Sequence, residues 1–150
     1  MLGVVKGFKP EALQPAGIDL SVDEVEVLDE AGVIGVSERY VPRGVKVEDK
    51  GGWWALKPGV YRIRFREIVS VPAGFVGFCF PRSSLLRMGL LLSCGVWDPG
   101  YRGRGQALLA VLNGKGVSLE RGARVAQFVL ARLWGPQSSE YRGVYMGEGL

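Results

Sequence analysis

The sequence predicts an all-β protein, a β-barrel or jelly-roll-like fold with one short helix. Valine is abundant, and apolar and polar residues alternate along several segments, which is typical of β-strands. The 23 glycines indicate many turns between short strands. With 150 residues, 47% of them hydrophobic, the chain can bury one core, so we expect a single domain over residues 1–150.

The first half of the chain predicts short elements around one clear strand. Residues 9–13 predict a helical turn with proline near its start. Residues 18–28 alternate and predict a half-buried strand. Residues 29–52 are polar and irregular, with short strands expected near 33–36. The tryptophan pair at 53–54 is expected to cover the edge of the core, with an exposed platform for a ligand as the alternative.

The middle of the chain predicts a helix between apolar strands. Residues 60–71 alternate strongly and predict one strand, and Pro-Ala-Gly at 72–74 predicts a turn. Residues 75–80 and 90–97 are mostly apolar and predict buried strands. Residues 83–88 between them predict the short helix.

Beyond these strands the pattern predicts a hairpin and a final strand. Pro-Gly at 99–100 marks the hairpin turn, and 106–113 is expected to return as its partner. Gly-Lys-Gly at 114–116 marks another turn, followed by a brief strand over 117–119. Residues 123–134 predict the last long strand.

Charge and composition exclude several kinds of chemistry. The net charge of +4 favours an anionic ligand, but no basic run predicts a nucleic-acid-binding arm. The chain has no histidine, which excludes Ser-His and Cys-His catalysis and histidine metal sites. The two cysteines, Cys79 and Cys94, are expected to be buried free thiols, with a disulfide or a nucleophile as alternatives.

The patterns of hydrophobicity predict a soluble protein. The start of the chain lacks the long apolar segment of a secretion signal, and no apolar run reaches the length of a membrane span. We therefore expect a cytoplasmic protein with no membrane partner.

One acid stands alone in a basic segment. Between Ile68 and Leu119, Asp98 is the only carboxylate, while five side chains are basic: Arg82, Arg87, Arg102, Arg104 and Lys115. This combination fits a polyphosphate site in which arginines and hydroxyls hold phosphate oxygens and the acid activates water. The alternative is a surface turn with ordinary solvated charges.

A Pro-Arg-Ser-Ser segment precedes the predicted helix. Ser83 and Ser84 either cap this helix or, together with Arg82, hold a phosphate at its start. Arg87 either reaches the same anion or pairs with a surface acid. Tyr101 either packs on a sugar ring, leaving no room for a 2′-hydroxyl, or lies at the edge of the core.

Four short motifs occur in order along most of the chain: Ala-Gly-Ile-Asp-Leu at 16–20, Pro-Arg-Ser-Ser at 81–84, Gly-Val-Trp-Asp-Pro-Gly-Tyr-Arg-Gly at 95–103 and Arg-Val-Ala-Gln-Phe at 124–128. Together they resemble the dUTPase family and its sister branch, the dCTP deaminases. The second motif continues in the manner of the deaminases and the archaeal dUTPases. The resemblance implies a distorted jelly-roll subunit and a homotrimer with three active sites at subunit interfaces.

The resemblance also implies a role for each motif residue. Asp98 would activate the water that attacks the α-phosphorus of dUTP, giving dUMP and pyrophosphate. Tyr101 would pack on the deoxyribose, and Asp19 would support the metal-phosphate shell through water or anchor Arg82. Mg²⁺ would be held mainly by the triphosphate. The phosphates would be bound by Ser83, Ser84 and Gln127, with Arg82 helping to order the site.

Two departures from the family pattern concern the deaminase reaction and the tail. The deaminase branch has a catalytic glutamate three residues before an asparagine, where this chain has Ala110 before Asn113. Because 106–113 contains no acid, we predict no dCTP deamination. The tail over 135–150 predicts either a lid, with Arg142 reaching the phosphates, or a disordered end.

The function expected from these patterns is hydrolysis of dUTP, which lowers dUTP and supplies dUMP for dTMP synthesis. The alternatives are a dCTP deaminase, a bifunctional deaminase and dUTPase, and a non-catalytic nucleotide-binding regulator on the same fold. A nucleic-acid binder is suggested only by the basic charge and the Arg-Gly-Arg-Gly segment at 102–105, so no nucleic-acid partner is expected.

Overall fold

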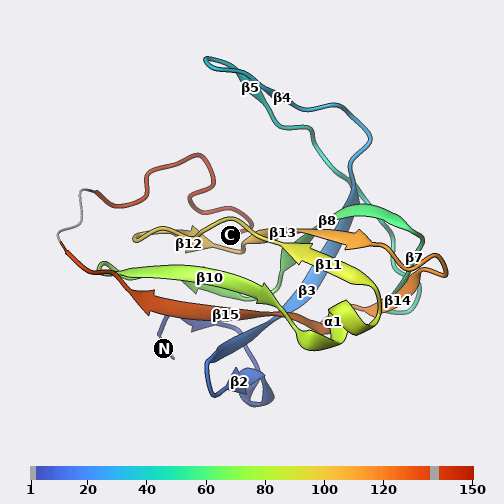
Figure 1. The fold of residues 1–150 in the computed structure, drawn as a ribbon, viewed down its shortest axis with the longest axis horizontal. Helices are drawn as coiled ribbons and strands as arrows, with labels where there is room; N and C mark the ends of the chain where they lie inside the picture. Colours follow the sequence, from blue (N-terminus) through green and yellow to red (C-terminus); the bar gives the residue numbers. More distant parts are fainter. Residues whose placement is uncertain (1–2, 136–138) are drawn as a thin grey trace.

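The computed structural model describes residues 3–135 and 139–150, in which nearly all regular elements are strands (Figure 1). The first half of the chain contains the 3-10 helix η1 (Pro10–Ala12) and β1 (Val5–Lys6), β2 (Leu13–Gln14), β3 (Gly17–Val27), β4 (Val33–Ile34), β5 (Arg39–Tyr40), β6 (Val45–Lys46), β7 (Trp53–Leu56), β8 (Gly59–Phe65) and β9 (Ile68–Ser70). The second half contains α1 (Ser83–Arg87) and β10 (Phe75–Pro81), β11 (Leu90–Ser93), β12 (Arg102–Gly103), β13 (Gln106–Val111), β14 (Val117–Glu120) and β15 (Arg124–Arg132). The prediction of an all-β fold with one short helix is confirmed.

The main sheet has eight strands and nearly closes on itself. Its strands follow the order β10-β15-β3-β8-β13-β11, with β2 and β6 added beside β3. All of these pairings are antiparallel. The two ends of the order, β10 and β11, lie side by side, which gives the sheet a barrel-like form (Figure 1). Smaller sheets are formed by β1-β9-β12, by β14-β7 and by β4-β5.

The first half of β3 is buried throughout, so the alternation expected for this strand is wrong there. Residues 17–22 are all buried, including the polar Asp19 and Ser21. These two residues tolerate burial because the Asp19 carboxylate is paired with two arginines and the Ser21 N–H donates to the buried Glu67. The strand therefore carries a polar cluster inside the protein as well as part of its core.

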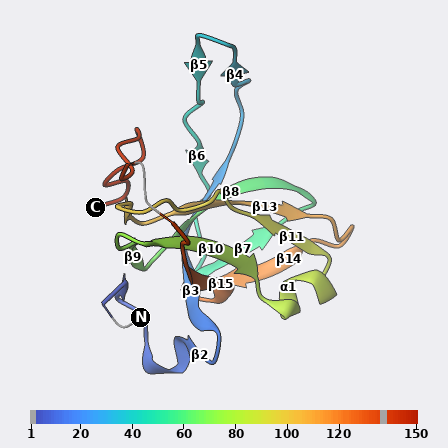
Figure 2. The same ribbon diagram turned by 60° about the vertical axis from the view of Figure 1, so that its left-hand side comes forward.

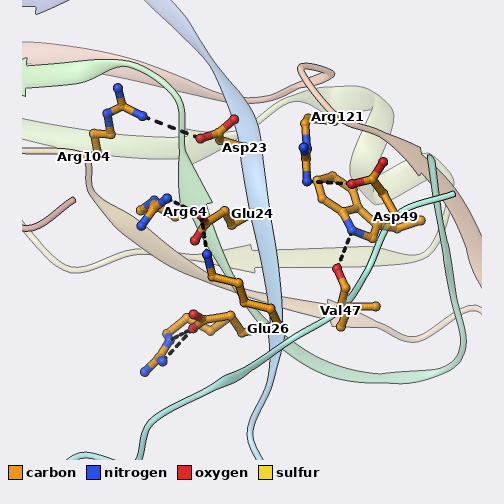
Figure 3. A network of polar contacts seen from close by, with 11 residues as sticks. Asp23, Glu24, Glu26, Val47, Asp49, Arg64, Arg104 and Arg121 are labelled. Atoms are coloured by element: carbon orange, nitrogen blue, oxygen red, sulfur yellow. Dashed lines mark hydrogen bonds and ion pairs between the residues drawn. The ribbon is translucent and has the colours of Figure 1, made fainter. Parts of the chain in front are cut away.

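The second half of β3 follows a register shift between Val22 and Glu24, and its acidic side chains face basic side chains of neighbouring strands. Glu24 lies 2.5 Å from Arg64 and 2.8 Å from Lys46, and Glu26 lies 2.6 Å from Arg62 (Figure 3). In the β3–β8 ladder Glu24 is opposite Arg64, and Glu26 is opposite Arg62. Partly exposed ion pairs of this kind add little stability, and their main effect is to favour this register over a one-residue slip.

Aromatic rings gather around Trp97 in the core. Its ring stacks on Phe128 at a centroid distance of 5.2 Å and on Tyr101 at 5.8 Å, and it meets the edge of Phe65 at 6.2 Å. Such pairs stabilise a core beyond their buried area. This cluster anchors the segment that continues into Asp98.

The tryptophan pair divides between core and surface. Trp54 is buried, and its indole Nε1 donates a hydrogen bond to the carbonyl of Val47 at 2.8 Å (Figure 3). Trp53 on the same strand points the other way and is 47% exposed. The expected cover of the core edge is thus provided by Trp54.

The strand expected over 60–71 is two strands. β8 ends at Phe65 and β9 begins at Ile68. Between them the Glu67 side chain turns inward, where its carboxylate accepts the Ser21 N–H at 2.8 Å. This break lets β9 leave the main sheet and pair with β1 and β12 instead.

Two strands expected to be buried are more exposed or shorter. β10 lies at one end of the main strand order, and only Gly77 of its residues is buried, while Phe80 is 53% exposed. The strand expected over 90–97 ends at Ser93 and alternates between buried and exposed side chains. The segment after it is irregular up to Trp97, which forms a single bridge with Gly77.

The turns and the remaining strands follow the prediction. The chain turns at Pro72, whose carbonyl accepts the Phe75 N–H, and at Asn113, whose carbonyl accepts the Gly116 N–H. β11 and β13 form the expected hairpin pair, and β14 and β15 match the two predicted C-terminal strands. None of the helices in the described part of the chain has the length and apolarity that crossing a membrane requires.

Residues 28–44 form an arm that leaves the barrel and ends in the β4–β5 hairpin. The arm projects away from the main sheet in two views (Figures 1 and 2). Ile34 and Val36 near its tip are almost fully exposed. Apolar side chains displayed in this way are typical of a surface that contacts another protein chain.

Candidate active site

Asp98 lies on a tight turn that two backbone contacts hold in place. Its carbonyl accepts the Tyr101 N–H at 3.1 Å, and Gly100 takes a φ of 87°, which favours glycine. Immediately before it, Trp97 and Gly77 exchange two backbone hydrogen bonds. The Asp98 side chain is exposed, so a carboxylate is presented to solvent from a fixed backbone.

Tyr101 lies at the edge of the core, close to the Asp98 turn. It is 4% exposed, with its ring stacked on Trp97 and against the edge of Tyr141. Its hydroxyl donates to the Glu148 carboxylate at 2.8 Å. Burial and this carboxylate raise the pKa of Tyr101, and burial also raises the pKa of Glu148. The phenol is therefore neutral and acts as a donor.

The described part of the tail is docked on the Asp98 turn. Tyr141 N–H donates to the Pro99 carbonyl at 2.7 Å, and Gly147 N–H donates to the Arg102 carbonyl at 2.8 Å. Residues 136–138 of the lid expected over 135–150 lie outside the described residues. The docked tail covers Tyr101 with the Tyr141 ring and the Glu148 carboxylate, so the position of the tail affects whether the Tyr101 ring is accessible.

A hollow of about 900 Å³ opens beside Asp98. Strand and loop residues on its wall include Trp97, Tyr101 and Gln106, and the tail contributes Tyr145 and Glu148. Three arginines also line it: Arg39 and Arg43 of the arm and Arg62 of β8. Sequence reasoning missed these arginines because they lie outside the basic segment around Asp98, and no local motif marks them.

A second hollow of about 680 Å³ joins Asp98 to the tail. Its wall includes Asp98, Pro99, Glu140 and Arg142. The structure therefore places Arg142 near the candidate base, as the lid hypothesis requires. Three predicted residues line one or both of these hollows. We call them the Asp98 group: Asp98, Tyr101 and Arg142.

The other predicted residues lie around Asp19 and in the short helix α1 that follows Arg82. Its carboxylate, 1% exposed, lies 3.2 Å from Arg82 Nε and 3.2 Å from Arg124 Nη1. Burial raises the pKa of Asp19, and the two guanidinium groups only partly oppose this shift. Gln127 stands opposite Asp19 in the β15–β3 ladder. Arg124 was missed as a site residue, although it begins the fourth motif.

The serines of the second motif do not cap α1 in the described contacts. The N-cap residue is Arg82, without a side-chain cap bond, and Ser83 and Ser84 are the first residues of the helix. Arg87 Nη1 donates to the Ser83 carbonyl at 2.8 Å, within its own helix. Ser84 lines a small hollow of about 190 Å³ that Arg124 also borders. We call the residues around Asp19 and in α1 the Asp19–α1 group: Asp19, Arg82, Ser83, Ser84, Arg87, Arg124 and Gln127.

Within one chain the Asp98 group and the Asp19–α1 group lie far apart. The Asp98 turn is bridged to Gly77, whereas Arg82 follows the far end of β10, five residues later. Five residues of extended strand span about 16 Å. Figures 1 and 2 show the same arrangement, with α1 at one end of β10 and the tail at the other. None of the hollows described here is lined by members of both groups.

The returning strand offers no carboxylate to the hollow. Ala110 is buried and pairs with Leu91 and Val60 on the flanking strands. The polar side chain that β13 does contribute to the hollow is the neutral amide of Gln106. In the part of the chain that the structure describes, no three His, Cys, Asp or Glu side chains gather as metal ligands would.

Comparison with known proteins identifies relatives over almost the whole chain. A family described as dCTP deaminase-like matches residues 2–133. A probable deoxyuridine 5'-triphosphate nucleotidohydrolase of Aeropyrum pernix is 57% identical over 150 residues, which cover 100% of this chain and 94% of the relative. A protein of the same name from Methanosarcina barkeri is 37% identical over 139 residues, covering 91% of this chain and 81% of the relative.

Solved structures with a similar fold come from both branches. A dCTP deaminase from Agrobacterium tumefaciens has a TM-score of 0.65 at 18% identity, over 85% of this chain and 43% of that one. A dUTPase from phage phi11 of S. aureus, described with a structural Mg(II) ion, has a TM-score of 0.56 at 16% identity, over 94% of this chain and 97% of that one. At these identities the likeness concerns the fold alone.

Proposed function

Since the chain belongs to the dCTP deaminase-like family, we propose that it is a dUTP diphosphatase, which hydrolyses dUTP to dUMP and pyrophosphate. The relatives that match along nearly its full length carry the name of this activity. The observation that separates it from a deaminase is the returning strand β13, on which the deaminase branch carries its glutamate and which here supplies Gln106 and no carboxylate to the hollow. The carboxylates on the wall of the hollow come from Asp98 and from Glu148 of the tail. Deamination needs a group that moves protons between water and the exocyclic amine, which an amide does not do.

We propose that Asp98 is the general base. Its carboxylate takes a proton from a water molecule, the water oxygen bonds to the α-phosphorus, and the bond to the β-phosphate oxygen breaks with its electron pair leaving on pyrophosphate. A well-placed base of this kind contributes about 10²- to 10⁴-fold. Its placement depends on the Gly77–Trp97 bridge and on the turn closed by the Tyr101 N–H.

The residues of the Asp19–α1 group are proposed to bind the triphosphate. The Ser83 and Ser84 hydroxyls, Gln127 and the guanidinium of Arg87 are donors suited to phosphate oxygens. Asp19 supports this proposal as an anchor, because it holds both Arg82 and Arg124 by ion pairs. These ion pairs restrict both guanidinium groups to fixed positions beside the start of α1.

Mg²⁺ is proposed as the cofactor, held mainly by the triphosphate. The donor set fits this arrangement better than a protein-held ion, since Asp19 is already occupied by two arginines and Asp98 is a single exposed carboxylate. Mg²⁺ favours phosphate oxygens and keeps several waters, and when bound it neutralises charge on the phosphates. Asp19 acts on the metal only indirectly, through Arg82 or through water.

A homotrimer with sites between subunits is proposed because each chain carries two separated halves of a site. The Asp98 group of one subunit would face the Asp19–α1 group of its neighbour. The two groups would then lie together, although about 16 Å along β10 separates them within one chain. The exposed apolar residues of the arm over 28–44 support contact with a second copy of the chain. Closure of the tail over a bound nucleotide, with Arg142 on the phosphates, belongs to the same proposal.

The experiment that tests the function uses purified protein with Mg²⁺ and either dUTP or dCTP. Nucleotide products, pyrophosphate and ammonia are measured together. We expect dUMP and pyrophosphate from dUTP and no ammonia from dCTP. Ammonia from dCTP would support a deaminase or a bifunctional enzyme, and tight dUTP binding without turnover would support a regulator.

A further inference from the structure

The two cysteines of the chain meet across neighbouring strands. Cys79 is in β10, opposite Phe128 of β15, and Cys94 directly follows β11. Their Sγ atoms lie 2.7 Å apart, and both residues are half-buried beside the core. Fifteen positions separate them in sequence, so this approach results from the way β10 and β11 pack at the seam of the barrel.

We propose that Cys79 and Cys94 are a redox-active pair that closes into a disulfide. A disulfide has an S–S bond of about 2.05 Å, so closure requires the sulfurs to approach by only about 0.7 Å. The oxidant is a small-molecule disulfide, RSSR. One cysteine thiolate attacks it and releases RSH, and the second displaces the remaining RS group as another RSH. Two thiol protons and two electrons leave the protein, and one S–S bond forms.

The disulfide would join the two parts of the chain that carry the candidate site. It closes the loop over 80–93, which contains Arg82, both serines of the second motif and α1. Its other end, Cys94, lies four residues before Asp98. The cross-link therefore fixes the start of the Asp98 loop to β10 by a covalent bond, in addition to the Gly77–Trp97 bridge. This proposal rests on the position of the two thiols and not on the proposed reaction.

The surroundings indicate a slow, stabilising cross-link and not a fast catalytic one. The neighbouring thiol and burial raise the pKa of Cys79, so its thiolate is scarce near neutral pH. Oxidation should consequently speed up as the pH rises. A closed loop of about 15 residues restricts the unfolded chain, and for a domain of this size we expect the melting temperature to rise by about 5–10 °C.

The test compares protein kept in a phosphine reductant with protein exposed to excess oxidised glutathione, a linear small-molecule disulfide, at pH 8.5. Oxidised protein is expected to lose about 2 Da, to show no thiols after denaturation, and to yield a 79–94 cross-linked peptide in a non-reducing digest. Its melting temperature should rise as stated and fall again on reduction. The single variants Cys79→Ser and Cys94→Ser serve as matched controls, which should show no oxidant-dependent rise.

Other outcomes would overturn the proposal. Two thiols that remain titratable in the denatured protein after long exposure would show that the pair does not close. A cross-link only between different chains, or a mass gain from the reagent on each cysteine, would show the same. If the serine variants fold poorly, the mass, thiol count and peptide map of the unmodified sequence still decide the question.

Discussion

Trp97 and Gly77 exchange two backbone hydrogen bonds, from Gly77 N–H to the Trp97 carbonyl at 2.8 Å and from Trp97 N–H to the Gly77 carbonyl at 3.0 Å. This bridge ties the Asp98 turn to β10, whose far end leads into Arg82. The same strand therefore positions a candidate base at one place and a candidate phosphate site about 16 Å further along. The distance between these two places is the structural reason for expecting a site shared between subunits.

Replacement of Asp98 by asparagine should strongly reduce turnover while leaving binding almost unchanged. Asparagine keeps the shape of the side chain but cannot take a proton from water, so kcat for dUTP should fall by about 10²- to 10⁴-fold. Affinity for a non-hydrolysable dUTP analogue, measured by calorimetry, should change less than threefold. Asp29→Asn, also an exposed acid, is the matched control and should behave as the unmodified protein. Retained turnover in Asp98→Asn would remove this residue from the mechanism.

Mixing two inactive variants should restore activity if sites lie between subunits. The first variant is Asp98→Asn and the second carries Ser83→Ala and Ser84→Ala. In trimers re-formed from an equal mixture, about one site in four combines an intact Asp98 with intact serines. Activity should therefore recover to about a quarter of that of the unmodified protein. If both groups act within one chain, the mixture will stay as inactive as its parts.

A methyl group at position 77 should displace the Asp98 turn. An added Cβ on Gly77 would lie 2.5 Å from the Phe128 ring, closer than packed atoms allow, and in a tight contact of 3.3 Å with Trp97 Cβ. Gly77→Ala is expected to cost about 1–3 kcal/mol of unfolding free energy. Because the bridge to Trp97 must shift, kcat should fall as well. Gly95→Ala is the control, since no atom lies within 4 Å of its added Cβ; similar losses in both variants would contradict this account.

Removal of the tail should weaken turnover without unfolding the barrel. The described tail residues belong to no strand of the main sheet, so deletion of residues 139–150 should leave the circular dichroism spectrum and the cooperative melting transition in place. Loss of Arg142 from the hollow that contains Asp98 should lower kcat/KM for dUTP by about tenfold or more. Arg142→Ala in the full chain is the sharper variant and should reproduce most of this loss. Unchanged kinetics in both would reject the lid hypothesis.

Local patterns along the sequence predicted most elements of this fold. The strand patterns over 18–28 and 123–134, and the turn residues at 72–74 and 114–116, each act within a few positions, and the structure confirms those strands and turns, although the first half of β3 is buried throughout and does not alternate. The break between β8 and β9 could not be predicted in this way. It depends on Glu67 reaching the Ser21 N–H, which is 46 positions away in the sequence.

The candidate site was predictable to the extent that its residues lie in motifs. The ion pair of Asp19 with Arg82 joins the first motif to the second, one of the two roles considered for Asp19. Arg39, Arg43 and Glu148 border the hollow because the arm and the tail form part of its wall, which no local motif marks. The separation of the Asp98 group from the Asp19–α1 group could not be predicted from the sequence either, because it follows from the direction and length of β10.

Glu67 should make the stability of the protein depend on pH in a way that one substitution removes. Burial raises the pKa of this carboxyl, and the Ser21 N–H only partly opposes the shift. The folded protein thus keeps the Glu67 proton to a higher pH than the unfolded chain does. Stability from this group is present below the ordinary pKa of glutamate and is lost as the pH rises through the raised value.

Glutamine at position 67 keeps an oxygen acceptor for the Ser21 N–H but has no charge to bury. Glu67→Gln should match the unmodified protein near pH 4 and exceed it in unfolding free energy near pH 8, as measured by guanidinium denaturation at both values. Glu67→Ala leaves the Ser21 N–H without this acceptor and should lose about 1–3 kcal/mol at both pH values. If the glutamine variant is less stable at pH 8 than at pH 4 relative to the unmodified protein, the ionised carboxylate stabilises the fold, and the sign argued here from burial is wrong.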